Sequence, residues 1–107
     1  MAIQLTIWER RDSGDRATMG NTALELCRIT RKLDGISSSR FYWTGVDNIV
    51  VLNEGETVAL DNAGQVGGPE YMRLAFTMGD NARIIMNTRL TDPRDAIQTY
   101  RATGRIK

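Results

Sequence analysis

Hydrophobic and polar residues alternate over residues 2–10, which is the pattern of a β-strand with one buried face. One face of this strand would carry three aliphatic side chains, namely Ile3, Leu5 and Ile7. The other face would carry Gln4, Thr6 and Trp8. The polar residues after the strand, with a glycine among them, indicate a loop.

Apolar positions recur every three or four residues over 18–33, which predicts a helix. Its apolar side would be formed by Met19, Ala23, Leu26, Cys27, Thr30 and Leu33. Thr18 is the expected N-cap of this helix. Gly35 can take the left-handed conformation that ends a helix.

Two more strands are expected at residues 38–45 and 48–54. The first is rich in aromatic residues, which favour strands, and the second contains a short apolar run. Turn-forming residues separate them, so the two strands are expected to form an antiparallel hairpin. Residues 55–68 contain several glycines and are expected to form a loose connection.

The stretch after Gly68 allows two interpretations. Pro69 suits the first turn of a helix, which favours a helix over 69–81 followed by a strand over 83–90. Residues 71–78 also alternate like a strand. That strand would pair with 83–90 as a hairpin, and the fold described next would then be wrong.

A last short helix is expected from about Thr91 to Ala102, with Pro93 in its first turn. The order of elements, β-α-β-β-α-β followed by this helix, is that of the ferredoxin-like motif. The sequence therefore predicts an α+β fold in one domain, residues 1–107, with a four-stranded antiparallel sheet and both main helices on one face. The apolar side chains of the other face need a cover, and within the chain only the last helix is left to provide one. A second copy packed sheet to sheet would bury this face, so we expect a homodimer.

A family resemblance extends over most of the chain. It is carried by residues 2–8, the helix at 18–33, the hairpin from Ser39 to Glu54 and the stretch from Gly68 to Arg105. These parts resemble the dimeric α+β barrel superfamily, and in particular small bacterial members that have no assigned role. The resemblance implies a ferredoxin-like dimer in a group that includes cofactor-independent monooxygenases, haem-degrading enzymes and dehydratases. The haem-degrading branch is not expected, because its usual histidine ligand has no counterpart.

The chain has no histidine and one cysteine, which excludes a Ser-His-Asp triad and a Cys-His pair. A zinc site of the usual kind would lack ligands, so we expect no metal and no cofactor. Cys27 cannot form an intramolecular disulfide and is expected to be a buried, unreactive thiol. No apolar run is long enough for a membrane helix and the start does not resemble a signal peptide, so a cytoplasmic protein is expected. The net charge of +1 gives no reason to expect nucleic-acid binding.

Several strand residues are candidates for ligand binding. Three are aromatic and could line a pocket or belong to the core or an interface, namely Trp8, Tyr42 and Trp43. Four are polar and could orient a ligand or stabilise an enolate-like anion, or could face water, namely Arg40, Asn53, Asn87 and Arg89. We expect Trp8 to form a wall of a cavity whose polar groups are Gln4 and Thr6, because a seal inside a dimer would have apolar neighbours.

Two functions fit these expectations. The first is a homodimeric protein that binds a small hydrophobic or aromatic ligand, with cofactor-independent oxygenase-like activity. The second is a non-catalytic dimeric interaction or structural module, which the lack of histidine, the commonest general base, favours. A cavity that holds Trp8 or Tyr42 together with a polar candidate would favour the first function, because the second predicts that these side chains pack without a cavity.

Overall fold

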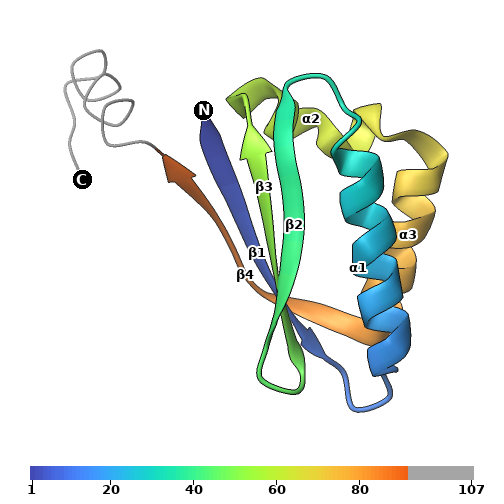
Figure 1. Ribbon diagram of the computed structural model, residues 1–107. Helices are drawn as coiled ribbons and strands as arrows, with labels where there is room; N and C mark the ends of the chain where they lie inside the picture. Colours follow the sequence, from blue (N-terminus) through green and yellow to red (C-terminus); the bar gives the residue numbers. More distant parts are fainter. Residues whose placement is uncertain (92–107) are drawn as a thin grey trace.

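The computed structural model describes residues 1–91 of the chain. Its elements are β1 (Ala2–Arg10), α1 (Arg16–Thr30), β2 (Ile36–Thr44), β3 (Asn48–Gly55), α2 (Thr57–Val66), α3 (Gly68–Asn81) and β4 (Ala82–Thr91). The strands form one antiparallel sheet in the order β2-β3-β1-β4, and α1 and α3 stand side by side against one face of it (Figure 1). This arrangement confirms the predicted ferredoxin-like α+β fold. The last predicted helix lies outside the described residues.

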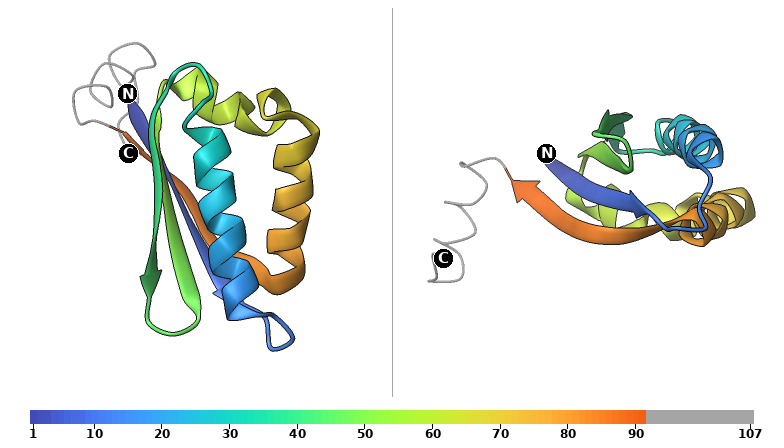
Figure 2. Two further views of the ribbon diagram at one scale, coloured as in Figure 1. Left: turned by 45° about the vertical axis from the view of Figure 1, so that its right-hand side comes forward. Right: turned by 90° about the horizontal axis from the view of Figure 1, so that it is seen from below.

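Strand β1 divides its side chains between the two faces of the sheet as its alternation predicts. One set, with Gln4 and Trp8, faces α1 and α3. Leu5 and Ile7 alternate with these residues and therefore point to the opposite side of the sheet. No helix of residues 1–91 lies on that side (Figure 2, left). The more aliphatic face of the central strand is therefore the face that the described helices leave uncovered.

The hydrophobic core lies between the sheet and the two long helices. Its buried cluster consists of Met19, Ala23, Ile49, Met78 and Ala82. These residues come from α1, β3, α3 and the start of β4, so the cluster joins both helices to the middle of the sheet. Trp8 packs against the edge of the cluster. A packed centre of this kind leaves room for a cavity only where small or polar side chains replace large ones.

Two local predictions are wrong. The stretch expected to be a loose connection contains α2, a helix of 10 residues with only Ala63 buried. Its N-cap residue, Glu56, makes no side-chain hydrogen bond to the helix. The local sequence therefore gave little indication that a helix begins there. The N-cap of α1 is Asp15 rather than Thr18, because the Asp15 carboxylate accepts the backbone N–H of Thr18 at 2.8 Å.

The ambiguous segment after Gly68 is a helix, as favoured, and not a strand. Pro69 occupies the first turn of α3 and Glu70 adds a favourable charge there. Gly68 itself has a φ of +74°, a left-handed conformation that lets the chain turn from α2 into α3. None of the helices within residues 1–91 has the length and apolar character needed to cross a membrane.

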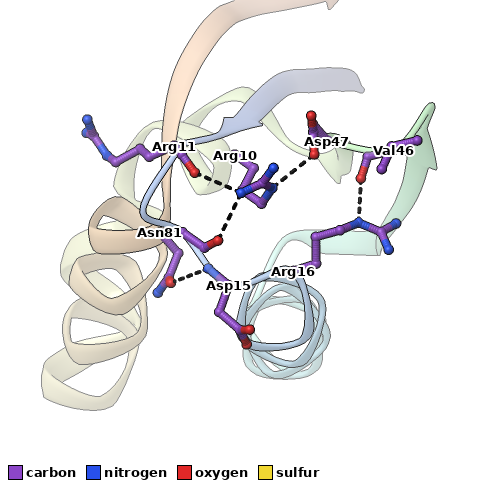
Figure 3. Close-up of polar contacts among 8 residues, drawn as sticks. Arg10, Arg11, Asp15, Arg16, Val46, Asp47 and Asn81 are labelled. Carbon is purple, nitrogen blue, oxygen red and sulfur yellow. Dashed lines mark hydrogen bonds and ion pairs between the residues drawn. The ribbon is translucent and has the colours of Figure 1, made fainter.

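Polar contacts hold the connections together at the end of the sheet where α1 begins (Figure 3). Arg10 Nε donates to Asp47 Oδ1 at 2.9 Å, and Arg10 Nη1 donates to the carbonyl oxygen of Arg11 at 3.2 Å. The Oδ1 atom of Asn81 accepts the backbone N–H of Asp15 at 3.0 Å. These groups are used for hydrogen bonds within the protein, so this cluster stabilises the fold and does not present a ligand site.

Candidate ligand cavity between the sheet and the helices

A cavity of about 480 Å³ lies between the sheet and the helices. Its floor, the side formed by the sheet, includes Gln4, Thr6, Trp8, Ser39, Val51, Asn53, Ile84, Asn87 and Arg89. The helical side includes Leu26, Cys27, Thr30, Leu60, Asp61, Tyr71, Ala75 and Met78. A volume of several hundred Å³ is typical of small-molecule sites.

The polar part of the floor follows from the register of β1 with β4. Gln4 pairs with Arg89, and Thr6 pairs with Asn87, so four polar side chains rise from neighbouring positions on one face. Arg89 Nε donates to Gln4 Oε1 at 2.8 Å. Gln4 Nε2 donates to Asn87 Oδ1 at 2.5 Å, and the Thr6 hydroxyl donates to the same oxygen at 3.2 Å. The four side chains therefore form one connected network.

Helix α2 reaches this network through Asp61. The Arg89 Nη2 atom donates to Asp61 Oδ1 at 2.7 Å, which makes a charge-assisted contact between the sheet and α2. The Asp61 side chain is 56% exposed, whereas that of Arg89 is 27% exposed. The ion pair thus lies at the solvent side of the cavity, with the guanidinium on the inner side.

A second polar group lies on the other side of β1. Ser39 of β2 pairs in register with Asn53 of β3, and its hydroxyl donates to Asn53 Oδ1 at 2.5 Å. The thiol of Cys27 lies beside Ser39 and is buried. Burial raises the pKa of the Cys27 thiol, while the hydrogen bond with Ser39 opposes that rise. Cys27 is a buried free thiol, as predicted, and it lines the cavity.

Apolar side chains form the rest of the lining. Trp8 and Val51 come from the sheet, and Leu26 and Met78 come from α1 and α3. The register of β1 with β4 shifts between Ile7 and Trp8, so Trp8 lies opposite Ile84. The wall next to the amide network is thus aromatic and aliphatic, which suits a flat hydrophobic ligand with a few polar atoms.

Tyr71 adds a phenol to the helical side. Its hydroxyl has no hydrogen-bond partner within residues 1–91. Burial raises the pKa of Tyr71 above its usual value of 10.0, and the neighbouring Cys27 adds to the rise. The phenol is therefore protonated at neutral pH and can donate a hydrogen bond.

The structure brings some of the predicted site residues together and separates others. Those in the cavity lining are Gln4, Thr6, Trp8, Asn53, Asn87 and Arg89. Arg40 and Tyr42 pair with Leu52 and Val50, so they lie on the uncovered face of the sheet and not in the cavity. Trp43 also lies outside the cavity.

Trp43 is held at the far end of β2 by a residue of α1. The guanidinium of Arg16 lies 4.5 Å from the centre of its ring, a cation–π contact. The Trp43 ring also lies over Gly20 of α1, where a Cβ atom would be 3.3 Å from the ring. Trp43 therefore packs closely against α1. This packing gives Trp43 a structural role.

Other lining residues were missed from the sequence. Asp61 lies in the segment expected to be loose, and Tyr71 lies in the segment for which the sequence allowed a helix or a strand. Ser39 had no local signal, because its place in the cavity depends on the register of β2 with β3. Within residues 1–91, no three carboxylate or thiol side chains lie close enough together to hold a metal ion.

The element order and the sheet order define a ferredoxin-like α+β fold, so the fold that the sequence resemblance implies is confirmed. No protein-family model matches the sequence, and no curated protein matches it. Solved structures do match, at low identity.

Three of these structures illustrate the likeness. Rv0793 from Mycobacterium tuberculosis has a TM-score of 0.70 at 19% identity, over 86% of this chain and 95% of that one. SnoaB, a cofactor-independent oxygenase from Streptomyces nogalater, has a TM-score of 0.71 at 10% identity, over 85% and 91%. An antibiotic biosynthesis monooxygenase has a TM-score of 0.57 at 17% identity, over 84% and 96%. At such identities the likeness shows the fold alone.

Proposed function

We propose that this chain binds a small aromatic or polyketide-like ligand in the cavity and acts on it as a cofactor-independent oxygenase. The observation that carries the proposal is the cavity of about 480 Å³, in which aromatic and aliphatic walls adjoin amide and guanidinium donors. The names of two similar structures, a cofactor-independent oxygenase and an antibiotic biosynthesis monooxygenase, support the same activity. A purely structural module would have no need of such a cavity, so its presence favours ligand binding.

The chemistry follows from the proposal that the oxygenase uses no cofactor. The substrate itself must supply the electrons that reduce O₂, and a hydroxyarene can do so once its hydroxyl is deprotonated. Arg89 and the amides of Asn53 and Asn87 would stabilise the resulting negative charge on oxygen. Asp61, the carboxylate next to Arg89, is placed to accept the proton. One oxygen atom of O₂ then enters the ring and the other leaves as water.

We propose that the working unit is a homodimer, in the cytoplasm. The uncovered face of the sheet carries Leu5 and Ile7 of β1 opposite Leu52 and Val50 of β3. Such a face gains stability when a second apolar face covers it, and two identical sheets supply this by symmetry. The unpaired thiol of Cys27 suits a reducing compartment.

Oxygen uptake in the presence of 1-naphthol tests the activity. The balanced reaction converts 1-naphthol and one O₂ into 1,4-naphthoquinone and one water. We expect uptake to require the protein and to need no added metal, flavin or haem. Binding of 1-naphthol without oxygen uptake would contradict the oxygenase activity and leave ligand binding standing, and the absence of binding would contradict the whole proposal.

A further inference from the structure

The hydrogen bonds on the cavity floor have a direction that Arg89 sets. A guanidinium can only donate hydrogen bonds. Arg89 Nε donates to Gln4 Oε1 at 2.8 Å, so the carbonyl end of the Gln4 amide must face Arg89. The amino end of Gln4 then faces the other way, where Nε2 donates to Asn87 Oδ1 at 2.5 Å.

The orientation of Asn87 follows from that of Gln4. Its Oδ1 atom accepts from Gln4 and from the Thr6 hydroxyl, at 2.5 and 3.2 Å, which occupies both of its lone pairs. Its Nδ2 group must therefore point away from these neighbours. No group within residues 1–91 accepts a hydrogen bond from that nitrogen, although Asn87 lines the cavity.

Asn53 repeats this arrangement on the other side of β1. It lies opposite Gln4 in the pairing of β1 with β3, and its Oδ1 atom accepts the Ser39 hydroxyl at 2.5 Å. Its Nδ2 group likewise has no acceptor in the part of the chain that the structure describes. Both asparagines thus use their oxygen within the protein, and their N–H groups have no acceptor within residues 1–91.

We propose that the amides of Asn53 and Asn87 form a donor pair that selects ligands with an acceptor oxygen, such as a ketone or an enolate. Arg89 and Gln4 are the positioning residues that hold Asn87 in its donating orientation. This inference rests on the proposed function, because it assumes that the cavity binds a ligand, and it adds the chemical class of that ligand.

The selectivity has a physical basis in the cost of leaving donors unpaired. A ligand that enters the cavity displaces water from these N–H groups. A ketone oxygen replaces the lost hydrogen bonds, whereas a hydrocarbon of the same shape leaves the N–H groups unpaired. Sites built around a hydrogen bond reject analogues that lack the bonding group for this reason. Asp61 does not compete for these amides, since its bonded oxygen pairs with Arg89 at the solvent side.

Two probes of matched shape test the donor pair. 1-Tetralone carries one ketone oxygen and no donor, and tetralin is the corresponding hydrocarbon. Isothermal titration is expected to show about tenfold tighter binding of 1-tetralone, the value of one to two neutral hydrogen bonds. Equal affinities would overturn the donor pair and leave the proposed ligand site standing. Binding of neither probe would overturn both.

The Gln4→Glu variant tests the positioning role. A carboxylate at this position still accepts from Arg89 but cannot donate to Asn87, so the Asn87 amide is expected to turn and present its oxygen. The preference for 1-tetralone over tetralin should then fall, because only Asn53 still donates, while tetralin still binds. Gln65→Glu, the same change at an exposed position of α2, is the matched control and should keep the preference.

The Asn87→Asp variant removes the donor without passing through Gln4. It should also lower the preference for 1-tetralone, and retained tetralin binding would show that the cavity is intact. A Gln4→Glu protein that keeps the tenfold preference would overturn the positioning role. An Asn87→Asp protein that keeps it would overturn the donor pair itself.

Discussion

Trp8 connects the cavity to the rest of the sheet. It lies where the register of β1 with β4 shifts, lines the cavity, and packs against the edge of the buried cluster. Its neighbours on the same face are Gln4 and Thr6, so its ring stands between polar and apolar parts of the lining. An aromatic side chain in this position offers a flat surface to a flat ligand.

The Trp8→Ala variant is expected to lose ligand binding more than stability. Because Trp8 is only partly buried, the free energy of unfolding should fall by less than about 3 kcal/mol, the lower end for removing a buried Trp. Affinity for 1-tetralone should fall by about tenfold or more. Trp43→Ala removes the same ring outside the cavity and should leave affinity unchanged. Trp8 faces the helices and not the uncovered face of the sheet, so a seal of the dimer interface is ruled out. A Trp8→Ala protein that is unfolded would show that Trp8 is needed in the core rather than as a cavity wall.

Alternation along single strands predicted part of this site. It grouped Gln4, Thr6 and Trp8 correctly, because a β-strand places every second side chain on one face. It did not show which face of β2 joins that group. Arg40 and Tyr42 lie away from the cavity because the register of β2 with β3 places them opposite Leu52 and Val50. That register depends on contacts between strands, which spacing along one strand does not contain.

The helices differ in how strongly local sequence specifies them. Helices α1 and α3 have caps or a first-turn proline and an apolar side, and both were predicted within a few residues of their bounds. Helix α2 has no side-chain hydrogen bond at its N-cap, and only Ala63 is buried. Its position is held by tertiary contacts, including that of Asp61 with Arg89, which no local pattern could predict.

The cap of α1 gives a pH-dependent prediction. The Asp15 carboxylate accepts hydrogen bonds from the hydroxyl and the backbone N–H of Thr18, both at 2.8 Å. These bonds, the side-chain one first, lower the pKa of Asp15 below its usual value of 3.8. The stabilisation is therefore present above pH 3.8 and is lost as the pH falls through the folded-state pKa.

The Asp15→Ala variant should unfold at a lower urea concentration than the wild type at pH 7, with an unchanged slope. The difference should shrink below about pH 3.8, as the wild-type carboxylate becomes protonated. Asp15→Asn keeps a capping oxygen without the charge and should stay close to wild type at pH 7. A difference for Asp15→Ala that is constant from pH 7 to pH 3 would contradict an ionised cap.

On the scale of the whole molecule, the described helices cover one face of the sheet and leave the more aliphatic face of β1 uncovered (Figure 2). Edge strand β4 adds to the exposed apolar surface, with Met86 50% and Leu90 46% exposed. Ile7 lies opposite Met86 and Ile3 lies opposite Leu90, so this surface continues across the sheet. An apolar surface of this extent is typical of a protein interface.

The Leu5→Lys variant tests the dimer. Leu5 lies between Leu52 and Thr88 on the uncovered face, so a charge there should prevent two sheets from packing together. Light scattering at micromolar concentration should give twice the chain mass of 12.0 kDa for the wild type and the chain mass for the variant. Leu24→Lys, at an exposed position of α1, should remain dimeric. A wild-type mass near 12.0 kDa would contradict the dimer.

The most direct test of the ligand cavity uses the two tryptophan indole signals in an NMR titration with 1-tetralone. The chain has two tryptophans, and Trp8 lines the cavity whereas Trp43 lies outside it under Arg16. We predict that the indole N–H signal of Trp8 shifts in a saturable way while that of Trp43 stays in place. A shift of the Trp43 signal alone, or of neither signal at saturating ligand, would contradict ligand binding in this cavity.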